Sequence, residues 1–267
     1  MSTRFRQSLL MLGLVSLAFA ALPSAVAAER WESYRWASET NPFLLTLGSN
    51  VSPKWDAHVR SAASDWSATP AVKVDVAPGG TTRRNCDPTM DRVEICNTRY
   101  GDTGWLGLTT LWAQGDDIEQ ATIRINDTYF DTPKYDKPAW RNFVMCHEVG
   151  HALGLDHQDE EFDNANLGTC LDYTNPPKSN QHPNRRDYRH LKAIYADAGG
   201  TTTGSSWPEA QSMADDLPAG DLPAAWAAAP TSWGDLVSGS ADSAEQTFIA
   251  DLGNGRRIIT LVMRAGG

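Results

Sequence analysis

The segment "KPAWRNFVMCHEVGHALGLDH", residues 137–157, decides the fold prediction because it contains the longest helical stretch of the chain and three of its six histidines. Pro138 suits the first turn of a helix, and Gly154 suits the end of one. His147 and His151 would lie one turn apart on the same side, since residues four apart on a helix differ by only about 40°. The pattern therefore predicts a helix whose last turns present two imidazoles to one point.

The third histidine of this segment, His157, completes a ligand set for a metal ion. A continued helix would rotate His157 by about 240° from His151, but Gly154 can adopt positive φ and turn the chain back. Three neutral imidazoles hold Zn²⁺ and leave a fourth position for water, which is the catalytic rather than the structural pattern. Glu148 lies on the flank of the same face, where a base acting on that water belongs. We therefore predict a catalytic Zn²⁺ site with the ligands His147, His151 and His157 and the base Glu148.

The complete spacing H-E-x-x-H-x-x-G-x-x-H at residues 147–157 resembles the signature of the metzincin metalloproteases. Over residues 42–198 the chain looks most like the matrixin-like bacterial members. The resemblance implies an α+β (mixed α/β) domain with a twisted mixed sheet, an active-site helix and a smaller C-terminal subdomain. It also implies a zinc endopeptidase that binds peptide antiparallel to an edge strand, for which residues 121–127 ("ATIRIND") are the candidate.

The chain departs from this family at the Met-turn beneath the metal. The matching segment "GTCLDYTNPP", residues 168–177, has Leu171 where the family has methionine. That methionine is a hydrophobic floor and not a ligand, so leucine of similar volume should serve, and the departure puts the subfamily rather than the metal in doubt. Tyr173 keeps two roles open: it binds the metal or stabilises a developing oxyanion, as in some branches of the family, or it simply packs there.

The first 28 residues have the layout of a secretory signal peptide. Arg4 and Arg6 precede an apolar run over residues 9–22, which small residues follow. The apolar run is short for a membrane-spanning helix, so we expect cleavage rather than anchoring and a secreted, extracellular protein.

Four cysteines in an exported chain predict two disulfides. The sequence leaves three pairings open. We prefer Cys86–Cys96, which closes a short loop, together with Cys146–Cys170.

Hydrophobic periodicity divides the remaining chain into short elements. A helix over residues 58–68 would bury Val59, Ala62, Ala63 and Trp66 on one face, and a last helix is expected over residues 185–198. Strands are expected where Val72, Val74 and Val76 alternate inward and over residues 104–112 and 121–127, with a hairpin around residues 253–255. The expected organisation is a signal peptide (1–28), a short N-terminal segment (29–41), a metzincin-like catalytic domain (42–198), an acidic Pro/Ala/Gly-rich linker (199–235) and a C-terminal β-hairpin segment (236–267).

The charge of the chain limits its partners. The formal net charge is −10, and loss of Arg4 and Arg6 with the leader takes it to −12. Such a surface repels phosphate backbones and anionic lipid, so we expect neither nucleic acid nor membrane as a partner of the mature protein. The expected partners are protein or peptide substrates, bound by a monomer.

Several alternatives compete with this interpretation. A gluzincin would use Glu160 or Glu161 as the third ligand, although His157 has the better claim. Ca²⁺ would need the aspartates Asp156, Asp159, Asp163 and Asp172, which lack EF-hand spacing and are more typical of an acidic surface. The single histidines His58, His182 and His190 follow no ligand pattern and are expected at the surface or at helix caps.

Two other function classes remain open. One is a catalytically silent, zinc-containing binding module, and the other is a zinc-stabilised structural domain of the cell surface. The structural class requires a fourth protein ligand, and the sequence offers no obvious one. No cysteine lies between the leader and Cys86, so the cysteine switch of matrixins has no counterpart here, and any latency would come from the acidic C-terminal part.

Overall fold

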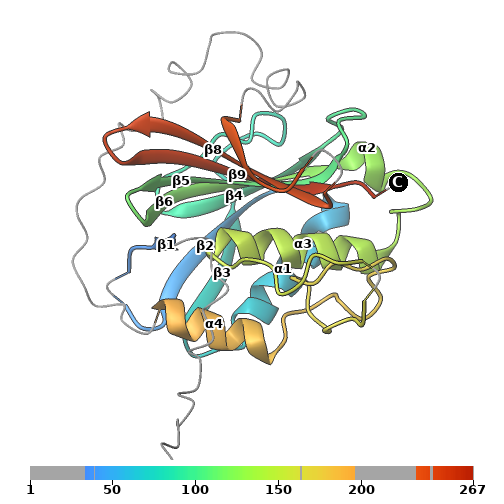
Figure 1. The fold of residues 1–267 in the computed structure, drawn as a ribbon, viewed down its shortest axis with the longest axis horizontal. Coiled ribbons are helices and arrows are strands. Elements are labelled where there is room, and N and C mark those ends of the chain that lie inside the picture. The colour runs from blue at the N-terminus through green and yellow to red at the C-terminus, as the bar shows by residue number, and fades with distance from the viewer. Residues whose placement is uncertain (1–33, 39, 163, 196–232, 241–242, 267) are drawn as a thin grey trace, which may run out of the picture.

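A mixed sheet of nine strands and four helices forms the part of the chain that the structure describes (Figure 1). The structure is a computed structural model that describes residues 34–38, 40–162, 164–195, 233–240 and 243–266. The helices are α1 (Pro53–Trp66), α2 (Asp127–Phe130), α3 (Pro138–Ala152) and α4 (Arg185–Tyr195). The strands are β1 (Arg35–Trp36), β2 (Phe43–Asn50), β3 (Val72–Pro78), β4 (Arg92–Thr98), β5 (Trp105–Gln114), β6 (Asp117–Asn126), β7 (Asp235–Ser238), β8 (Glu245–Gly253) and β9 (Arg256–Arg264).

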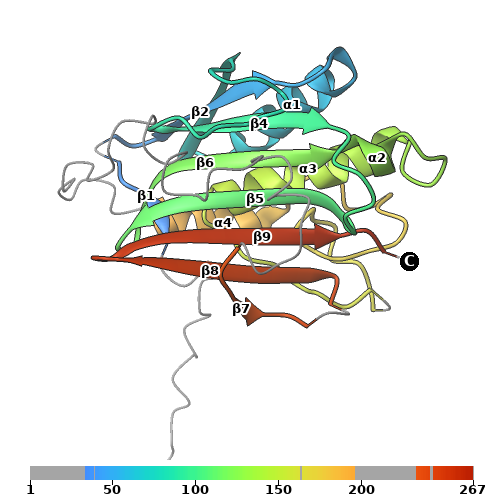
Figure 2. The ribbon, with the colours of Figure 1, turned by 90° about the horizontal axis from the view of Figure 1, so that it is seen from above.

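The strand order is β3-β2-β4-β6-β5-β9-β8-β7, with β1 pairing to β6 outside this path. One half of the sheet is parallel, because β2 pairs in parallel with β3 and β4, and β4 with β6. The other half, from β6 through β5, β9 and β8 to β7, is antiparallel. Helices α1 and α3 pack on one face of the sheet. Figure 2 views the sheet from its other face, with these helices behind the strands. The predicted mixed α/β class is therefore confirmed.

The helices agree with their sequence signals. The predicted face of α1, with Val59, Ala62, Ala63 and Trp66, is buried. Helix α3 has Pro138 in its first turn, and Gly154 follows its end with a φ of +83°. Helix α4 forms within its predicted range.

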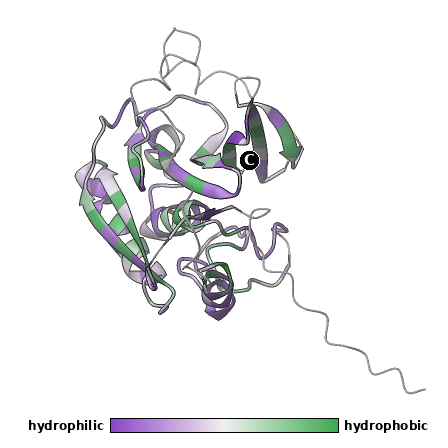
Figure 3. Cartoon of the chain, turned by 90° about the vertical axis from the view of Figure 1, so that its left-hand side faces the viewer, coloured by the Kyte–Doolittle hydropathy of each residue, from purple (hydrophilic) through white to green (hydrophobic). Residues whose placement is uncertain are grey.

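The strands bring two corrections. Val76 of β3 is 37% exposed, so the inward alternation ends at Val74. The candidate edge strand, residues 121–127, is also wrong, because β6 lies between β4 and β5 and has no free edge over these residues. Hydrophilic and hydrophobic residues alternate along several strands (Figure 3), but alternation does not show which strand lies at an edge.

The C-terminal hairpin is part of the main sheet. Strands β8 and β9 pair antiparallel around Asn254 and Gly255, and β9 pairs antiparallel with the whole of β5. Its residues Ile259, Leu261 and Met263 are buried in the same core as α1 and α3. The predicted leader and most of the predicted linker lie outside the described residues.

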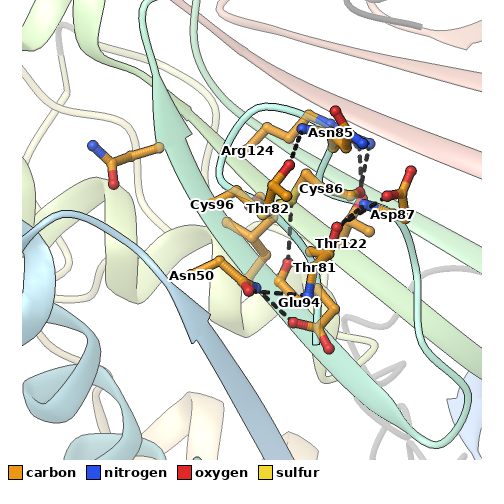
Figure 4. Close-up of a disulfide and its surroundings, with 12 residues drawn as sticks. Asn50, Thr81, Thr82, Asn85, Cys86, Asp87, Glu94, Cys96, Thr122 and Arg124 are labelled. Carbon is orange, nitrogen blue, oxygen red and sulfur yellow. Dashed lines mark hydrogen bonds between the residues drawn. A yellow bond between two sulfur atoms is a disulfide. The ribbon is translucent and has the colours of Figure 1, made fainter. Parts of the chain in front are cut away.

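Two disulfides form, Cys86–Cys96 and Cys146–Cys170, as preferred from the sequence. Figure 4 shows the first, where the loop before β4 is tied to β4 and the Arg124 side chain donates to the Cys86 carbonyl over 2.8 Å. Disulfides of this kind are typical of an oxidising compartment. No helix in the described ranges combines the length and the apolar character needed to cross a membrane.

Gly154 provides a test of the turn that ends α3. A Cβ added at Gly154 would lie 2.5 Å from the Tyr34 carbonyl oxygen, in addition to the strain of its positive φ. We expect Gly154→Ala to lower the free energy of unfolding by about 3 kcal/mol or more in urea titrations. The matched control is Gly101→Ala, where φ is +88° and no atom lies within 4 Å of the added Cβ. The control should cost only about 1 kcal/mol, and equal losses would contradict the steric argument.

Candidate metal centre

Three imidazoles converge on one buried point beneath the sheet. His147 and His151 come from the last turns of α3, and His157 comes from the chain that Gly154 turns back. Their Nε2 atoms are separated by 2.9 Å (His147–His151), 3.1 Å (His151–His157) and 3.4 Å (His147–His157). Ligands 2.0–2.1 Å from one tetrahedral zinc ion are about 3.4 Å apart, so the three nitrogens have nearly the spacing of ligands that share an ion.

The hydrogen bonds of two Nδ1 atoms determine the tautomers of their rings, and so the state of the Nε2 atoms. His147 Nδ1 lies 2.8 Å from the Cys170 carbonyl oxygen, and His151 Nδ1 lies 2.9 Å from that of Leu155. A carbonyl oxygen only accepts, so each Nδ1 carries the hydrogen of its neutral ring. The Nε2 lone pairs of these two rings therefore point at each other, an arrangement that a cation between them would stabilise.

A fourth side chain, Glu245 at the start of β8, closes the cluster. Its Oε2 lies 3.1 Å from His147 Nε2 and 2.8 Å from His157 Nε2, and its Oε1 lies 3.4 Å from His151 Nε2. The four residues form a group that could hold a metal ion. The sequence offers no obvious fourth protein ligand, and the structure brings Glu245 to the position where one could bind. Glu245 is 98 residues from His147 in the sequence, and no local pattern around it indicates a ligand.

The charges of this cluster also favour a cation. Burial lowers the pKa of His147 to about 4. Burial acts in the same direction on His157, but the charge of Glu245 and the hydrogen bond with Glu160 outweigh it and raise the pKa to about 10. The buried carboxylate of Glu245 thus needs a positive charge beside it, which a divalent ion would supply without a proton on any ring.

Glu148 lies on the sheet-facing side of α3 with one free oxygen. Thr109 Oγ1 donates to Glu148 Oε2 over 2.6 Å, while the buried Oε1 has no hydrogen-bond partner among the described residues. Burial raises the pKa of the Glu148 carboxyl well above its usual range. Gly107 of β5 makes room for it, because a Cβ at Gly107 would lie 2.2 Å from Glu148 Oε1.

Leu171 and Tyr173 lie next to the histidines, as the alignment with the Met-turn predicts. Leu171 is fully buried beneath α3, and a Cβ added at Gly150 would lie 3.0 Å from its Cδ2. The Tyr173 ring centre is 5.0 Å from that of His157, and its hydroxyl donates to Glu245 Oε2. The structure thus places Tyr173 at the cluster, while its catalytic role stays a prediction.

The remaining histidines are not brought to the cluster. His58 Nδ1 pairs with the Asn142 side chain and His182 Nδ1 with Asp65 Oδ2. His190 lies outside the cluster but is buried within α4, so its expected position at the surface or at a helix cap is wrong.

The acidic side chains of the loop after α3 do not replace the third histidine. Glu160 approaches the outer nitrogen of His157, and Glu161 is exposed, so the gluzincin alternative finds no support. Among the described residues, Asp159 and Asp172 belong to no group of three or more metal ligands, and Asp156 joins only His157 and Glu160. Asp163 lies outside the described residues, and calcium binding remains a prediction without support.

The Cys146–Cys170 disulfide should matter for metal retention, because it joins α3 to the residue whose carbonyl orients His147. We expect the double variant Cys146→Ser/Cys170→Ser to lose about 3 kcal/mol of stability. Its zinc affinity, measured by competition with a chromogenic chelator, should fall by about tenfold or more. Cys86→Ser/Cys96→Ser is the matched control and should lower stability while leaving zinc affinity unchanged. Equal zinc affinities of both variants would argue against this positioning role.

Comparison with protein-family models and with curated proteins finds no match to this chain. The chemistry of the site therefore has to be judged from its own residues. Three neutral imidazoles and a carboxylate suit a divalent ion of borderline softness, and Glu148 offers a proton acceptor outside that ligand set. The arrangement can hold a metal and move a proton beside it.

Proposed function

We propose that the chain is a secreted zinc-dependent endopeptidase of the metzincin type that hydrolyses peptide bonds of extracellular proteins. The observation that carries the proposal is Glu148, a buried carboxylate held by Thr109 with one unpaired oxygen, beside three histidines with the spacing of zinc ligands. The disulfides and the leader-like N-terminus support an exported protein. In this proposal a monomer acts on protein or peptide substrates and binds neither nucleic acid nor membrane.

The residues of the site have separate tasks in the proposed reaction. His147, His151 and His157 would hold Zn²⁺, which when bound polarises a carbonyl and lowers the pKa of a water molecule toward about 7. Glu148 Oε1 accepts the proton of the attacking water and passes it to the leaving amine. Thr109 keeps the other oxygen of Glu148 engaged, so that Oε1 is the atom that exchanges the proton. The Tyr173 hydroxyl, which donates to Glu245, would donate instead to a developing oxyanion.

Glu245 favours a second candidate, a catalytically silent or structural zinc module. A fourth protein ligand is the mark of a structural zinc site. A structural site, however, gives no role to a buried glutamate that is outside the ligand group and has an oxygen without a partner among the described residues. Since an unpaired buried carboxylate oxygen destabilises the fold, its presence favours catalysis.

Glu148→Gln tests the proposed base, because an amide has nearly the same shape and cannot accept the proton. We expect the zinc content, measured by atomic absorption, to stay at one ion per chain. Peptide cleavage, measured on a peptide library, should fall by about 100- to 10,000-fold. The comparison is best made both in the unaltered chain and with Glu245→Ala, because Glu245 closes the site.

Glu161→Gln is the matched control, since it makes the same chemical change at an exposed position of the neighbouring loop. The control should cleave as the parent does, and chelator should abolish cleavage in both. Retained cleavage by Glu148→Gln would contradict the assigned base. Bound zinc with no cleavage in any of these proteins would favour the structural module.

A further inference from the structure

We propose that the C-terminal hairpin β8–β9 is a built-in inhibitor of the metal centre, with Glu245 as a removable fourth ligand and β9 in the place of an extended peptide. The inference rests on the proposed function and adds its regulation. Two independent features of the hairpin support it, the contacts of Glu245 and the pairing of β9.

Glu245 takes the position that water and substrate would need. Its carboxylate oxygens lie within 3.4 Å of the Nε2 atoms of all three histidines. Its Oε2 also accepts the hydroxyl of Tyr173, and so occupies the donor that an oxyanion would use. Glu245 alone therefore contacts the three proposed metal ligands and the proposed oxyanion donor, and leaves only Glu148 without a contact to it.

The pairing of β9 covers the strand that a peptide would join. Without β9, β5 would be the edge of the sheet directly above α3, because its other side pairs with β6. Strand β9 runs antiparallel to β5 from Trp105↔Arg264 to Gln114↔Arg256 and takes its main-chain groups. An extended peptide that adds to a sheet edge uses these same groups.

The strand register links the two features. Gly107 of β5 opposes Met263 of β9, and Met263 opposes Glu245 of β8. Gly107 is also the residue against which Glu148 lies. Gly107, Met263 and Glu245 therefore form one row across three strands. The row begins at the residue that contacts the proposed base, crosses the strand that takes the place of substrate, and ends at the carboxylate beside the histidines. A shift of the hairpin by one residue would turn Glu245 to the other face of the sheet.

Glu245 is held at Oε2 by the Tyr173 hydroxyl and differs from the histidines at its other oxygen. The described part of the chain gives its buried Oε1 no hydrogen bond, whereas His147 and His151 are each fixed by a backbone carbonyl. A pocket lined by Asp156, His157, Glu160, Ser238, Glu245 and Thr247 reaches it from outside. A small ligand can therefore reach the ion once the carboxylate is gone, even with the hairpin in place.

Acetohydroxamate binding to the cobalt(II)-loaded full-length protein tests directly whether Glu245 blocks the metal centre, a role that we call the plug. The probe is small, chelates the ion, and changes the visible spectrum of cobalt without any need for peptidase activity. We expect Glu245→Ala to bind it about 100-fold more tightly than the parent, because the parent must first release its own carboxylate. Glu245→Gln, which keeps the shape and weakens the ligand, should lie between them and serves if the alanine variant fails to fold. Asp251→Ala removes an exposed carboxylate of the same strand and should bind as the parent does.

Peptide cleavage by the same proteins separates the two proposals. Higher cleavage by Glu245→Ala than by the parent supports both. Tighter acetohydroxamate binding by Glu245→Ala supports Glu245 as an inhibitory ligand whether or not this variant cleaves, because β9 still covers β5 against a peptide. Equal acetohydroxamate affinities of the parent, Glu245→Ala and Glu245→Gln, with unchanged cobalt spectra, overturn the plug whatever the cleavage.

Discussion

The structure depends on one electrostatic constraint, the convergence of three imidazole nitrogens and a carboxylate in a space with almost no solvent. The backbone carbonyls of Cys170 and Leu155 hold two rings in the tautomer that points a lone pair inward. Such a cluster is stable only with positive charge at its centre. The turn at Gly154, the disulfide at Cys146 and the floor at Leu171 are all means of holding this one point.

The two glutamates of the site, Glu148 and Glu245, have opposite pKa shifts because their surroundings differ. Glu245 faces the histidines, and the charge of His157 lowers the Glu245 pKa well below the usual range although burial acts to raise it. Glu148 faces Thr109 and Gly107 of β5, and there burial dominates and raises its pKa well above the usual range. One carboxylate is therefore suited to binding a cation and the other to exchanging a proton. Glu245 lies in the strand row Gly107–Met263–Glu245 and Glu148 contacts Gly107 of that row, so both carboxylates adjoin the same paired strands.

The sequence predicts what local spacing encodes and misses what depends on distant pairing. Helix α3 and its glycine turn follow from patterns within short stretches, and the disulfides have the pairing preferred among the three that the sequence leaves open. The sequence patterns do not predict strands β2 and β4, which pair with each other and are buried by partners elsewhere in the chain. The edge assigned to residues 121–127 failed for the same reason, because an edge is a property of the assembled sheet. Glu245 is the most consequential omission, and only the register of β8 on β9 brings it to the histidines.

The hairpin also protects an edge of the sheet. A strand that is open to a substrate is open to other chains as well, and unpaired edges promote aggregation. Strand β9 covers β5, and the outer edge passes to β7, which has only four residues, all exposed and including Asp235. The opposite edge, β3, has the charged side chains of Lys73 and Asp75 on its exposed positions. Coverage of the β5 edge and the approach of Glu245 to the histidines therefore come from the same two strands.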